Sequence, residues 1–392
     1  MLESFHAGVN TMHPSAIVLL EFHPERDDLT RDKELRDGLS VALRMGNNLW
    51  VANDESLSLE RLTLSPEDST GTSSMTHGHV QFSLADFLAL PLPPGGDPEA
   101  LHEADIEGLA CDGKYLWIAG SHSLRRKNPK AGDGTKKAQK RLASVSADGN
   151  RYLLARIPVV EQDGTHTLVR ETEHKGRLRT AARLRGDAHG NELTLLLLHD
   201  EHFGPFLAIP GKDNGFDIEG LAVAGKHLLV GLRGPVLRGW AAIVEIALAE
   251  DEQPTQLRLA PVEDGDGRLY RKHFLDLGGL GIRDLCVQGK DLLILAGPTM
   301  DLDGPVVVFR WPGGAEPDKE SIVSADELER VLDLPFGHGV DHPEGMTLFP
   351  LMNGSEEGLL VVHDAASPSR QIGESTVVAD VFPLPRRKKN GR

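Results

Sequence analysis

Short apolar runs that alternate with tight polar turns recur along the chain. In the clearest unit, residues 218–223 are apolar apart from Glu219, residues 228–232 are apolar, and the two runs flank a turn at Gly225-Lys226. Two apolar runs joined by a glycine-containing turn are typical of a β-hairpin. The same pattern predicts a second hairpin over residues 106–120, with its turn at Gly113-Lys114.

A short acidic phrase opens these hairpins and repeats along the chain. The residues Asp-Ile-Glu-Gly-Leu-Ala occupy positions 105–110 and again positions 217–222. Weaker copies read Gly-Ile-Arg-Asp-Leu at 281–285, His-Pro-Glu-Gly-Met at 342–346 and Ser-Val-Ala-Leu at 40–43. Repetition of this kind is the sequence signature of a repeat architecture. It also places an acidic residue at one fixed point in several repeats.

The spacing of the repeats predicts an all-β fold, specifically a β-propeller. The repeats align on positions 40, 107, 219, 283 and 344, at intervals of 67, 112, 64 and 61 residues. This spacing fits propeller blades, which are four-stranded antiparallel sheets round a central channel. The long interval has room for two units, so we expect six blades. Five blades with a large insertion after the second is the alternative, and two unrelated β-domains with coincidental hairpins is another.

Two further elements are predicted between the hairpins. Residues 192–199 contain four consecutive leucines and are a candidate core strand in the long interval. Residues 324–332 are rich in acids after a serine, which is typical of a capped helix.

Composition narrows the classes of partner. We expect one propeller domain over residues 1–385 and a disordered basic tail over residues 386–392. The formal net charge of −17 argues against a nucleic-acid partner. The chain has no run of 18 apolar residues, and residues 1–10 lack a signal-peptide pattern, so no membrane association is expected. The two cysteines are expected to be free thiols, which fits a cytoplasmic location.

Hairpin geometry predicts where chemistry would gather. The residue that enters the first strand of a hairpin and the residue that leaves the second lie at the same end of a blade, so these positions converge on one face round the channel. Before the first strands stand Asp105, Glu107, Asp217, Glu219, Arg283, Asp284, His342 and Glu344, and after the second strands stand Asn53, Asp54, Glu55, His122, Arg233, His363 and Asp364. Almost every member is ionisable, although a fold needs only turn residues there.

Several carboxylates near one axis repel one another unless a cation lies among them. Glu107, Glu219 and Glu344 are therefore candidate ligands for Ca²⁺ or another divalent cation. Arg233 and Arg283 offer another solution, because they can neutralise the acids internally or bind an anionic ligand. Alternatively, each glutamate accepts backbone hydrogen bonds from the next blade and holds the ring closed.

One basic stretch interrupts the acidic background. Residues 125–141 contain eight Lys or Arg residues, and Asp133 is the only acid among them. The stretch follows His122, so it is expected to lie over the channel face. Two interpretations are open: a solvated flexible loop, or a mobile lid that attracts an anionic ligand.

These residues resemble those of the bacterial family labelled domain of unknown function 3616. The similarity runs from about residue 35 to 365 and includes Ile-Glu-Gly-Leu at 106–109 and 218–221, the segment 277–284, and Pro-Glu-Gly at 343–345. The resemblance implies a propeller-like fold and no established activity. More distantly, the chain is similar to phytase-like and gluconolactonase-like propellers, in which a Glu-Gly pair at an inner strand can ligate calcium. Glu107, Glu219 and Glu344 match that pattern, whereas Arg283 and Ser40 depart from it and favour a lopsided site.

Three functions remain open at this stage. The favoured one is binding of a small anionic ligand or a protein partner on the channel face, by Asp54, Glu107, His122, Glu219, Arg233, Arg283, Asp284 and Glu344. The second is a metal-dependent hydrolase of a phosphoester or lactone, in which the arginines hold the anionic group and His122 or Glu107 accepts the proton. The third is a structural scaffold. Whether the chain is an enzyme, and its oligomeric state, are not indicated by the sequence.

Overall fold

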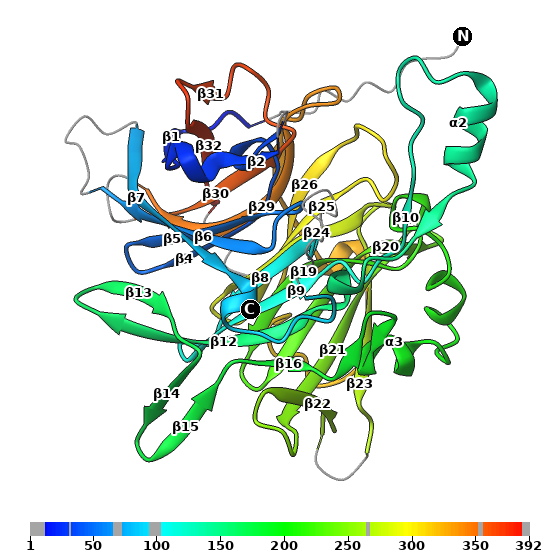
Figure 1. Cartoon of the computed structure of the whole chain (residues 1–392). Helices are drawn as coiled ribbons and strands as arrows, with labels where there is room; N and C mark the ends of the chain where they lie inside the picture. Colours follow the sequence, from blue (N-terminus) through cyan, green and yellow to red (C-terminus); the bar gives the residue numbers. More distant parts are fainter. Residues whose placement is uncertain are drawn as a thin grey trace.

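Five β-hairpins, one for each predicted repeat, form the centre of the molecule (Figure 1). Their strands are β4 (Leu39–Met45) with β5 (Asn48–Asn53), β8 (Ile106–Cys111) with β9 (Tyr115–Gly120), β19 (Asp217–Ala224) with β20 (His227–Leu237), β24 (Gly281–Gln288) with β25 (Asp291–Gly297), and β29 (His342–Pro350) with β30 (Glu357–Asp364). This computed structural model describes residues 12–30, 33–65, 73–93, 103–263, 267–351 and 356–385. The tail at 386–392 and the segment 1–10 lie outside these ranges.

The first strands of the hairpins form a closed ring. Strand β4 contacts β8, β8 contacts β19, β19 contacts β24, β24 contacts β29, and β29 returns to β4. The fold is therefore all-β and propeller-like, as predicted. The described residues supply these five hairpins and no sixth, so the expectation of six blades is not confirmed.

Each hairpin is extended outward by further strands. These are β6 (Ser58–Leu64) and β7 (Ser73–Ser83), β12 (Leu154–Gln162) and β16 (Ala182–Leu184), β21 (Trp240–Glu250) with β22 (Gln256–Ala260) and β23 (Tyr270–Asp276), β26 (Val306–Trp311) and β28 (Glu329–Leu334), and β32 (Thr376–Pro383) and β1 (Ala16–Glu21). The N-terminal strand β1 thus completes the sheet of the last hairpin by pairing antiparallel with β32. It also pairs in parallel with β7, which joins the last sheet to the first.

The long interval between the second and third repeats holds insertions. They include β10 (Arg125–Arg126), α2 (Thr135–Leu142), β11 (Val145–Ser146), the hairpin of β14 (Glu171–His174) and β15 (Arg177–Thr180), the pair β17 (Gly186–Asp187) and β18 (Gly190–Asn191), and α3 (Glu192–Leu197). The remaining elements are α1 (Pro24–Asp27), β2 (Asp28–Thr30), β3 (Lys33–Glu34), β13 (Thr165–Leu168), β27 (Ser321–Val323) and β31 (Gln371–Ile372). In the part of the chain that is described, no helix is long and apolar enough to cross a membrane.

The prediction of a core strand at residues 192–199 is wrong. The segment forms α3 because Asn191 and Thr194 make a reciprocal capping box at its start. Leu193 and Leu197 are buried whereas Leu195 is exposed, which is the spacing of a helix with one apolar face.

The predicted helix at residues 324–332 is also largely wrong. Ser324 does form a capping box with Glu327, but the helical turn ends at Glu327. Strand β28 follows at once, and its inward residues Leu332 and Leu334 alternate with more exposed ones. A good N-cap therefore starts only one turn where the following residues alternate with the period of a strand.

Glycine in the repeated Glu-Gly pair allows the first strands to approach closely. A Cβ atom on Gly108 would lie 2.5 Å from the Cβ atom of Leu221 in the next repeat. A Cβ atom on Gly345 would lie 2.6 Å from the Cα atom of Val41. These glycines pack one repeat against the next, so the repeated phrase combines a packing residue with a channel residue.

Candidate functional site

Every first strand carries a β-bulge at the same repeat position. The strand pairing skips one residue in each copy, and the skipped residues are Ser40, Glu107, Glu219, Arg283 and Glu344. These are the five positions on which the sequence repeats align. A bulge leaves one residue outside the ladder and re-aims its side chain. Here it directs the variable residue of each repeat to one end of the ring.

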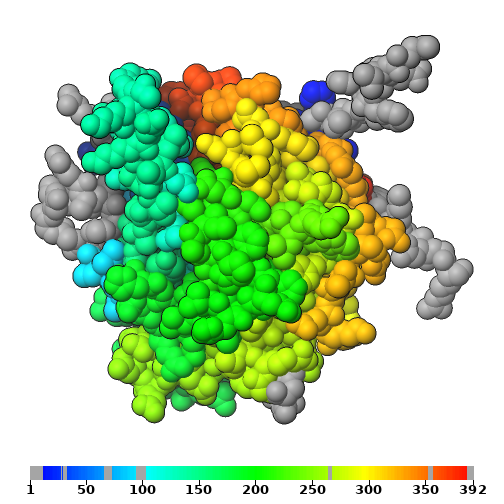
Figure 2. Space-filling view, turned by 90° about the vertical axis from the view of Figure 1, so that its right-hand side faces the viewer, coloured from blue at the N-terminus to red at the C-terminus, as the bar shows by residue number. Residues whose placement is uncertain are grey.

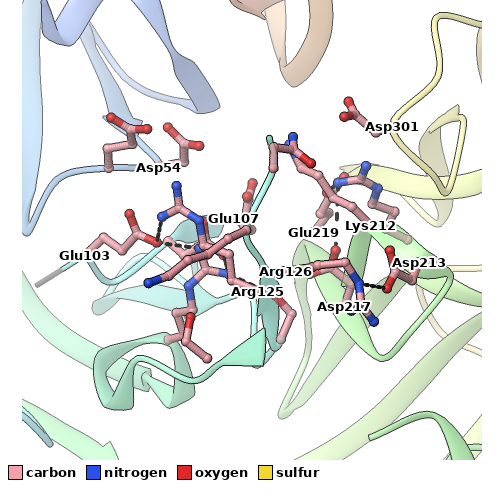
Figure 3. A pocket seen from close by; sticks show the side chains of 18 of the residues that line it. Asp54, Glu103, Glu107, Arg125, Arg126, Lys212, Asp213, Asp217, Glu219 and Asp301 are labelled. Carbon is pink, nitrogen blue, oxygen red and sulfur yellow. Dashed lines mark hydrogen bonds and ion pairs between the residues drawn. The ribbon is translucent and has the colours of Figure 1, made fainter. Parts of the chain in front are cut away.

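A cavity of about 560 Å³ lies at this end of the ring (Figure 3). Nearly all of its lining is ionisable, and carboxylates outnumber cations. The acids are Asp54, Glu55, Glu103, Asp105, Glu107, Asp213, Asp217, Glu219, Asp301, Glu344 and Asp364, and the cations are Arg125, Arg126, Lys127, Lys130, Arg141, Arg151, Lys212 and Arg233. The convergence that hairpin geometry predicted is therefore present for Asp54, Glu107, Glu219, Arg233 and Glu344.

Arg283 neutralises two of the predicted glutamates. Its Nη1 atom lies 2.5 Å from Oε1 of Glu344 and 3.3 Å from Oε2 of Glu219. Arg283 and Glu219 are both nearly buried, so this contact is shielded from water. The arginine that replaces glutamate in the fourth repeat is thus the counter-ion for the repeats on either side.

Two further arginines are paired in the same way. Nη1 of Arg233 donates to Oε1 of Glu219 at 2.6 Å, and its Nε donates to the carbonyl of Thr299 at 2.9 Å. Arg151 contacts Glu103 at 2.5 Å and Asp105 at 2.8 Å. The buried arginines of the site are therefore committed to carboxylates of the protein itself.

Within the described residues, four carboxylates of the lining have no ion-pair partner: Asp54, Glu107, Asp301 and Asp364. Among the described residues, neither Glu107 nor Asp54 forms an ion pair or a hydrogen bond through its side chain. Burial raises the pKa of Glu107 well above its usual range, and the charges of Glu219 and Asp105 raise it further. Burial, followed by the charge of Asp364, does the same for the pKa of Asp54. This side of the cavity therefore has an excess of carboxylates, and it favours a positive charge or bound protons.

The paired acids are also shifted. Burial and the neighbouring Asp364 raise the pKa of Glu344 to about 8, although Arg283 opposes the shift. Burial and the charge of Glu219 raise the pKa of Asp217 to about 7, although Arg233 opposes this shift. Both groups exchange protons near neutral pH, so the charge of the cavity depends on pH there.

The basic stretch lies over the cavity as the lid interpretation requires. Arg125, Arg126, Lys127, Lys130 and Arg141 all contribute to the lining. The short β10–β11 pair and α2 carry this segment, which stands out as a blue-green lobe at the upper left in Figure 2. No residue of α2 is buried, so few apolar contacts fix the helix to the rest of the molecule.

Two ion pairs attach the base of this segment to the cavity wall. Nη1 of Arg125 lies 2.9 Å from Oε1 of Glu103, and Nε of Arg126 lies 2.6 Å from Oδ2 of Asp213. Lys127, Lys130 and Lys212 line the cavity and form no ion pair within the described ranges. They are the cations that the site leaves available.

Three of the predicted ligand-binding residues are not in the cavity lining: Arg283, which pairs with two lining glutamates, and the two residues His122 and Asp284. His122 is buried, its Nδ1 lies 2.8 Å from the carbonyl of Gly120, and its Nε2 contacts the side-chain amide of Asn191 at 2.7 Å. Burial lowers its pKa to about 4, so the ring is neutral. Asp284 is buried and accepts the backbone N–H groups of Leu285 and Met346, the latter from the next repeat. Both side chains are occupied by contacts that hold the fold together.

The predicted metal ligands were Glu107, Glu219 and Glu344. The guanidinium of Arg283 lies against the last two, in the position that a shared cation would need. Among the described residues, no group of three or more His, Cys, Asp or Glu side chains has an arrangement that could hold a metal ion. A divalent cation at this cavity therefore stays a prediction, and Glu107 is the one candidate ligand without a partner.

Several residues of the site were not found from the sequence. Glu103, Arg151 and Lys212 come from connecting segments that do not repeat, so the alignment of hairpins has no counterpart for them. The sequence position of Glu103 could have indicated it, because it stands two residues before Asp105. Both carboxylates form an ion pair with Arg151.

Comparison with known proteins decides the family. The model of the family described as "Protein of unknown function (DUF3616)" matches residues 38–380. The chain belongs to the DUF3616 family. No curated protein matches the DUF3616 chain.

Solved structures give only weak matches to this DUF3616 protein. A tail fibre of Staphylococcus aureus phage P68 is 9% identical with a TM-score of 0.30; the match covers 89% of this chain and 50% of that one, so the chain spans half of its length. A putative 6-phosphogluconolactonase from Bacteroides fragilis is 15% identical with a TM-score of 0.27, covering 87% and 81%. Kuenenia stuttgartiensis hydrazine synthase is 11% identical with a TM-score of 0.29, covering 100% and 71%. Similarity at this level carries no argument about function.

Proposed function

We propose that this DUF3616 protein is a five-bladed propeller that binds a small polar ligand carrying both positive and negative groups at the acidic end of its channel. The observation that carries the proposal is the group of unpaired carboxylates that includes Asp54 and Glu107, in a cavity whose lining also offers the unpaired lysines Lys127 and Lys212. The positive part of the ligand lies against the carboxylates. Its negative part accepts hydrogen bonds from the lysines.

This proposal modifies the expectation of a purely anionic ligand. Arg233 and Arg283 were to hold the anion, but both donate to glutamates of the protein. An anion bound by Arg233 or Arg283 would have to displace Glu219 or Glu344 from a buried ion pair, which costs several kcal/mol. A ligand that also supplies positive charge avoids this cost, because it leaves the pairs intact and relieves the repulsion round Glu107.

The test is a thermal-shift screen of the whole chain with Glu107→Gln. The panel contains sugar phosphates, amino-sugar phosphates, nucleotides and divalent cations, alone and in combination. Removing one of several crowded carboxylates should raise the melting temperature of the free protein by a few degrees and abolish the stabilisation by the ligand. The matched control is Glu173→Gln in the exposed hairpin β14–β15, which should change neither quantity.

Each other outcome points to a different function. If Glu107→Gln lowers the melting temperature and no compound stabilises the unmodified protein, the acidic face is a structural scaffold. If only large partners stabilise it, the site is a protein-binding surface.

A metal-dependent hydrolase of a phosphoester or lactone is the second candidate. The crowding of Asp54 and Glu107 with Asp105 favours it, because oxygen-rich clusters with raised pKa values suit a hard cation. Elemental analysis, with a melt before and after chelator, separates the two functions. A stoichiometric ion whose removal lowers the melting temperature would favour the hydrolase, and esterase and lactonase assays would follow.

A further inference from the structure

A second cavity lies at the opposite end of the same five strands. It measures about 300 Å³, and every first strand contributes to its wall. Its lining residues are Leu43, Arg44, Gly46, Leu109, Ala110, Cys111, Leu221, Ala222, Val223, Leu285, Cys286, Val287, Thr347 and Leu348. No acid is among them. The channel therefore has one charged end and one apolar end.

Arg44 is the one ionisable side chain with a permanent charge at this apolar end. It also lines a smaller adjoining cavity of about 80 Å³, whose wall includes Phe349, Leu351 and Val381 and again contains no acid. The guanidinium carbon lies 5.5 Å from the centre of the Phe349 ring. The backbone N–H of Arg44 donates to Oγ1 of Thr347 at 3.0 Å, which fixes the residue to the neighbouring first strand.

The guanidinium of Arg44 has no hydrogen-bond or ion-pair partner in the described part of the chain. Its Nε is buried and makes no hydrogen bond. By contrast, Arg151, Arg233 and Arg283 at the acidic end are each paired with carboxylates. Buried donors are normally satisfied, and arginine's fork of N–H groups matches the two oxygens of a carboxylate. Although the chain is rich in acids, none of the described residues that line the two cavities is one, which leaves the guanidinium open to an acceptor from outside.

The walls suit the apolar part of such a ligand. Leu109, Leu221 and Leu285 come from successive repeats and face the same space as the two cysteines. Burial raises the pKa of Cys286 to about 12, so its thiol stays protonated and behaves as a small apolar group. A volume of about 300 Å³ is at the lower end of ligand pockets, which limits the ligand to a small molecule.

We propose that the apolar end of the channel is a binding site for a small apolar monocarboxylate. The carboxylate accepts hydrogen bonds from Arg44, and the hydrocarbon part packs against the leucines of neighbouring repeats. The site is independent of the ligand proposed for the acidic end, because the two cavities share no residue.

The test compares three probes of equal chain length by calorimetry: octanoate, octanol and octylamine. Octanoate should bind best, and octylamine should bind worst because Arg44 repels it. Arg44→Met removes the charge while keeping much of the apolar volume, and it should weaken octanoate about tenfold or more with little effect on octanol. Equal binding of octanoate and octanol, or no binding of either, would overturn the proposal.

Arg61 supplies a matched control. It too is a partly buried arginine, with its guanidinium carbon 5.6 Å from the ring of Phe82 and a buried Nε without a partner. It lines neither of the two apolar cavities. Arg61→Met should leave octanoate affinity unchanged, and an equal loss in both variants would assign the effect to general destabilisation.

A second measurement needs no variant at Arg44. Cys111 and Cys286 are the only cysteines of the chain, and both line the cavity. Saturating octanoate should slow their alkylation by a neutral maleimide several-fold, while octylamine should not. Alkylation rates that octanoate leaves unchanged would show that the acid binds elsewhere, which also contradicts the proposal.

Discussion

The guanidinium of Arg283 lies 2.5 Å from the carboxylate of Glu344, and the two residues are the bulge residues of adjacent repeats. The bulge residue is acidic in three repeats and basic in the repeat of Arg283. That repeat lies between the repeats of Glu219 and Glu344. The ring therefore contains its own counter-ion. Glu107, which is not next to Arg283, has no counter-ion among the described residues.

Removing this counter-ion should destabilise the fold. Arg283→Met leaves Glu219 and Glu344 close together in a buried setting, and the free energy of unfolding should fall by about 3–5 kcal/mol. Chemical denaturation measures the change. Adding Glu344→Gln to the same chain should recover part of the loss, because it removes one of the two stranded charges.

The control for this change is Arg330→Met. Arg330 pairs with Asp333 on the surface, and its side chain is 52% exposed. Exposed pairs contribute about 1 kcal/mol or less. Equal losses in the two variants would contradict the role of Arg283 as the central counter-ion.

Stability should fall as pH rises from about 6.5 to 8. The pKa of Asp217 is raised to about 7 and that of Glu344 to about 8, so the folded chain still holds protons that the unfolded chain has released. For each such proton, the free energy of unfolding falls by up to about 1.4 kcal/mol for every unit by which the pH rises. Melting temperatures across this window measure the effect. Glu344→Gln should flatten the slope, and a slope that Glu344→Gln leaves unchanged would show that Glu344 is already ionised in the folded state.

The packing role of the repeated glycine gives a third prediction. In Gly108→Ala the added methyl would lie 2.5 Å from Cβ of Leu221, so one repeat must move away from the next. Overpacking of this kind costs about 1–3 kcal/mol in the free energy of unfolding. Gly134→Ala is the control, because no atom lies within 4 Å of the added methyl and the backbone φ of −67° suits alanine. A stabilising Gly108→Ala would show that the strands have room there.

The basic stretch at residues 125–141 should contribute to ligand affinity through its positive charge. Lys127→Glu places an acid over a cavity that already has excess carboxylates, and the affinity for a ligand found in the screen should fall several-fold, by about 1 kcal/mol. Lys136→Glu is matched to it, since Lys136 lies on α2 and outside the lining. Raising the salt concentration should reduce the difference between the unmodified protein and Lys127→Glu. Identical affinities would favour the solvated-loop interpretation.

The sequence predicted the repeat positions because one physical requirement recurs in them. Each copy needs a bulge residue that points into the channel, and in Glu107-Gly108 and Glu344-Gly345 the next residue must also be small for packing. Such constraints produce a repeated motif that can be recognised in the sequence. The cytoplasmic location and the metal stay predictions.

The rest of the site could not be predicted because it depends on contacts between segments that do not repeat. Arg151 reaches Asp105 from a turn 46 residues further along the chain. His122 follows a repeated strand, so its position suggested the channel, yet a positive φ of 55° turns it towards Asn191. Hairpin geometry places a Cα atom at one end of a blade, but local dihedral angles decide where the side chain points.

Pairing of β1 with β32 has a consequence for how the protein is made. Of the described strands, β1 leaves the ribosome first, whereas β32, its antiparallel partner from Ala16↔Val381 to Glu21↔Thr376, is synthesised after the others. Until then only the short parallel contact with β7 is available to β1. The pairing of β1 with β32 can therefore form only after β32 has left the ribosome, and every nascent chain passes through a stage in which the edge of its last sheet is exposed.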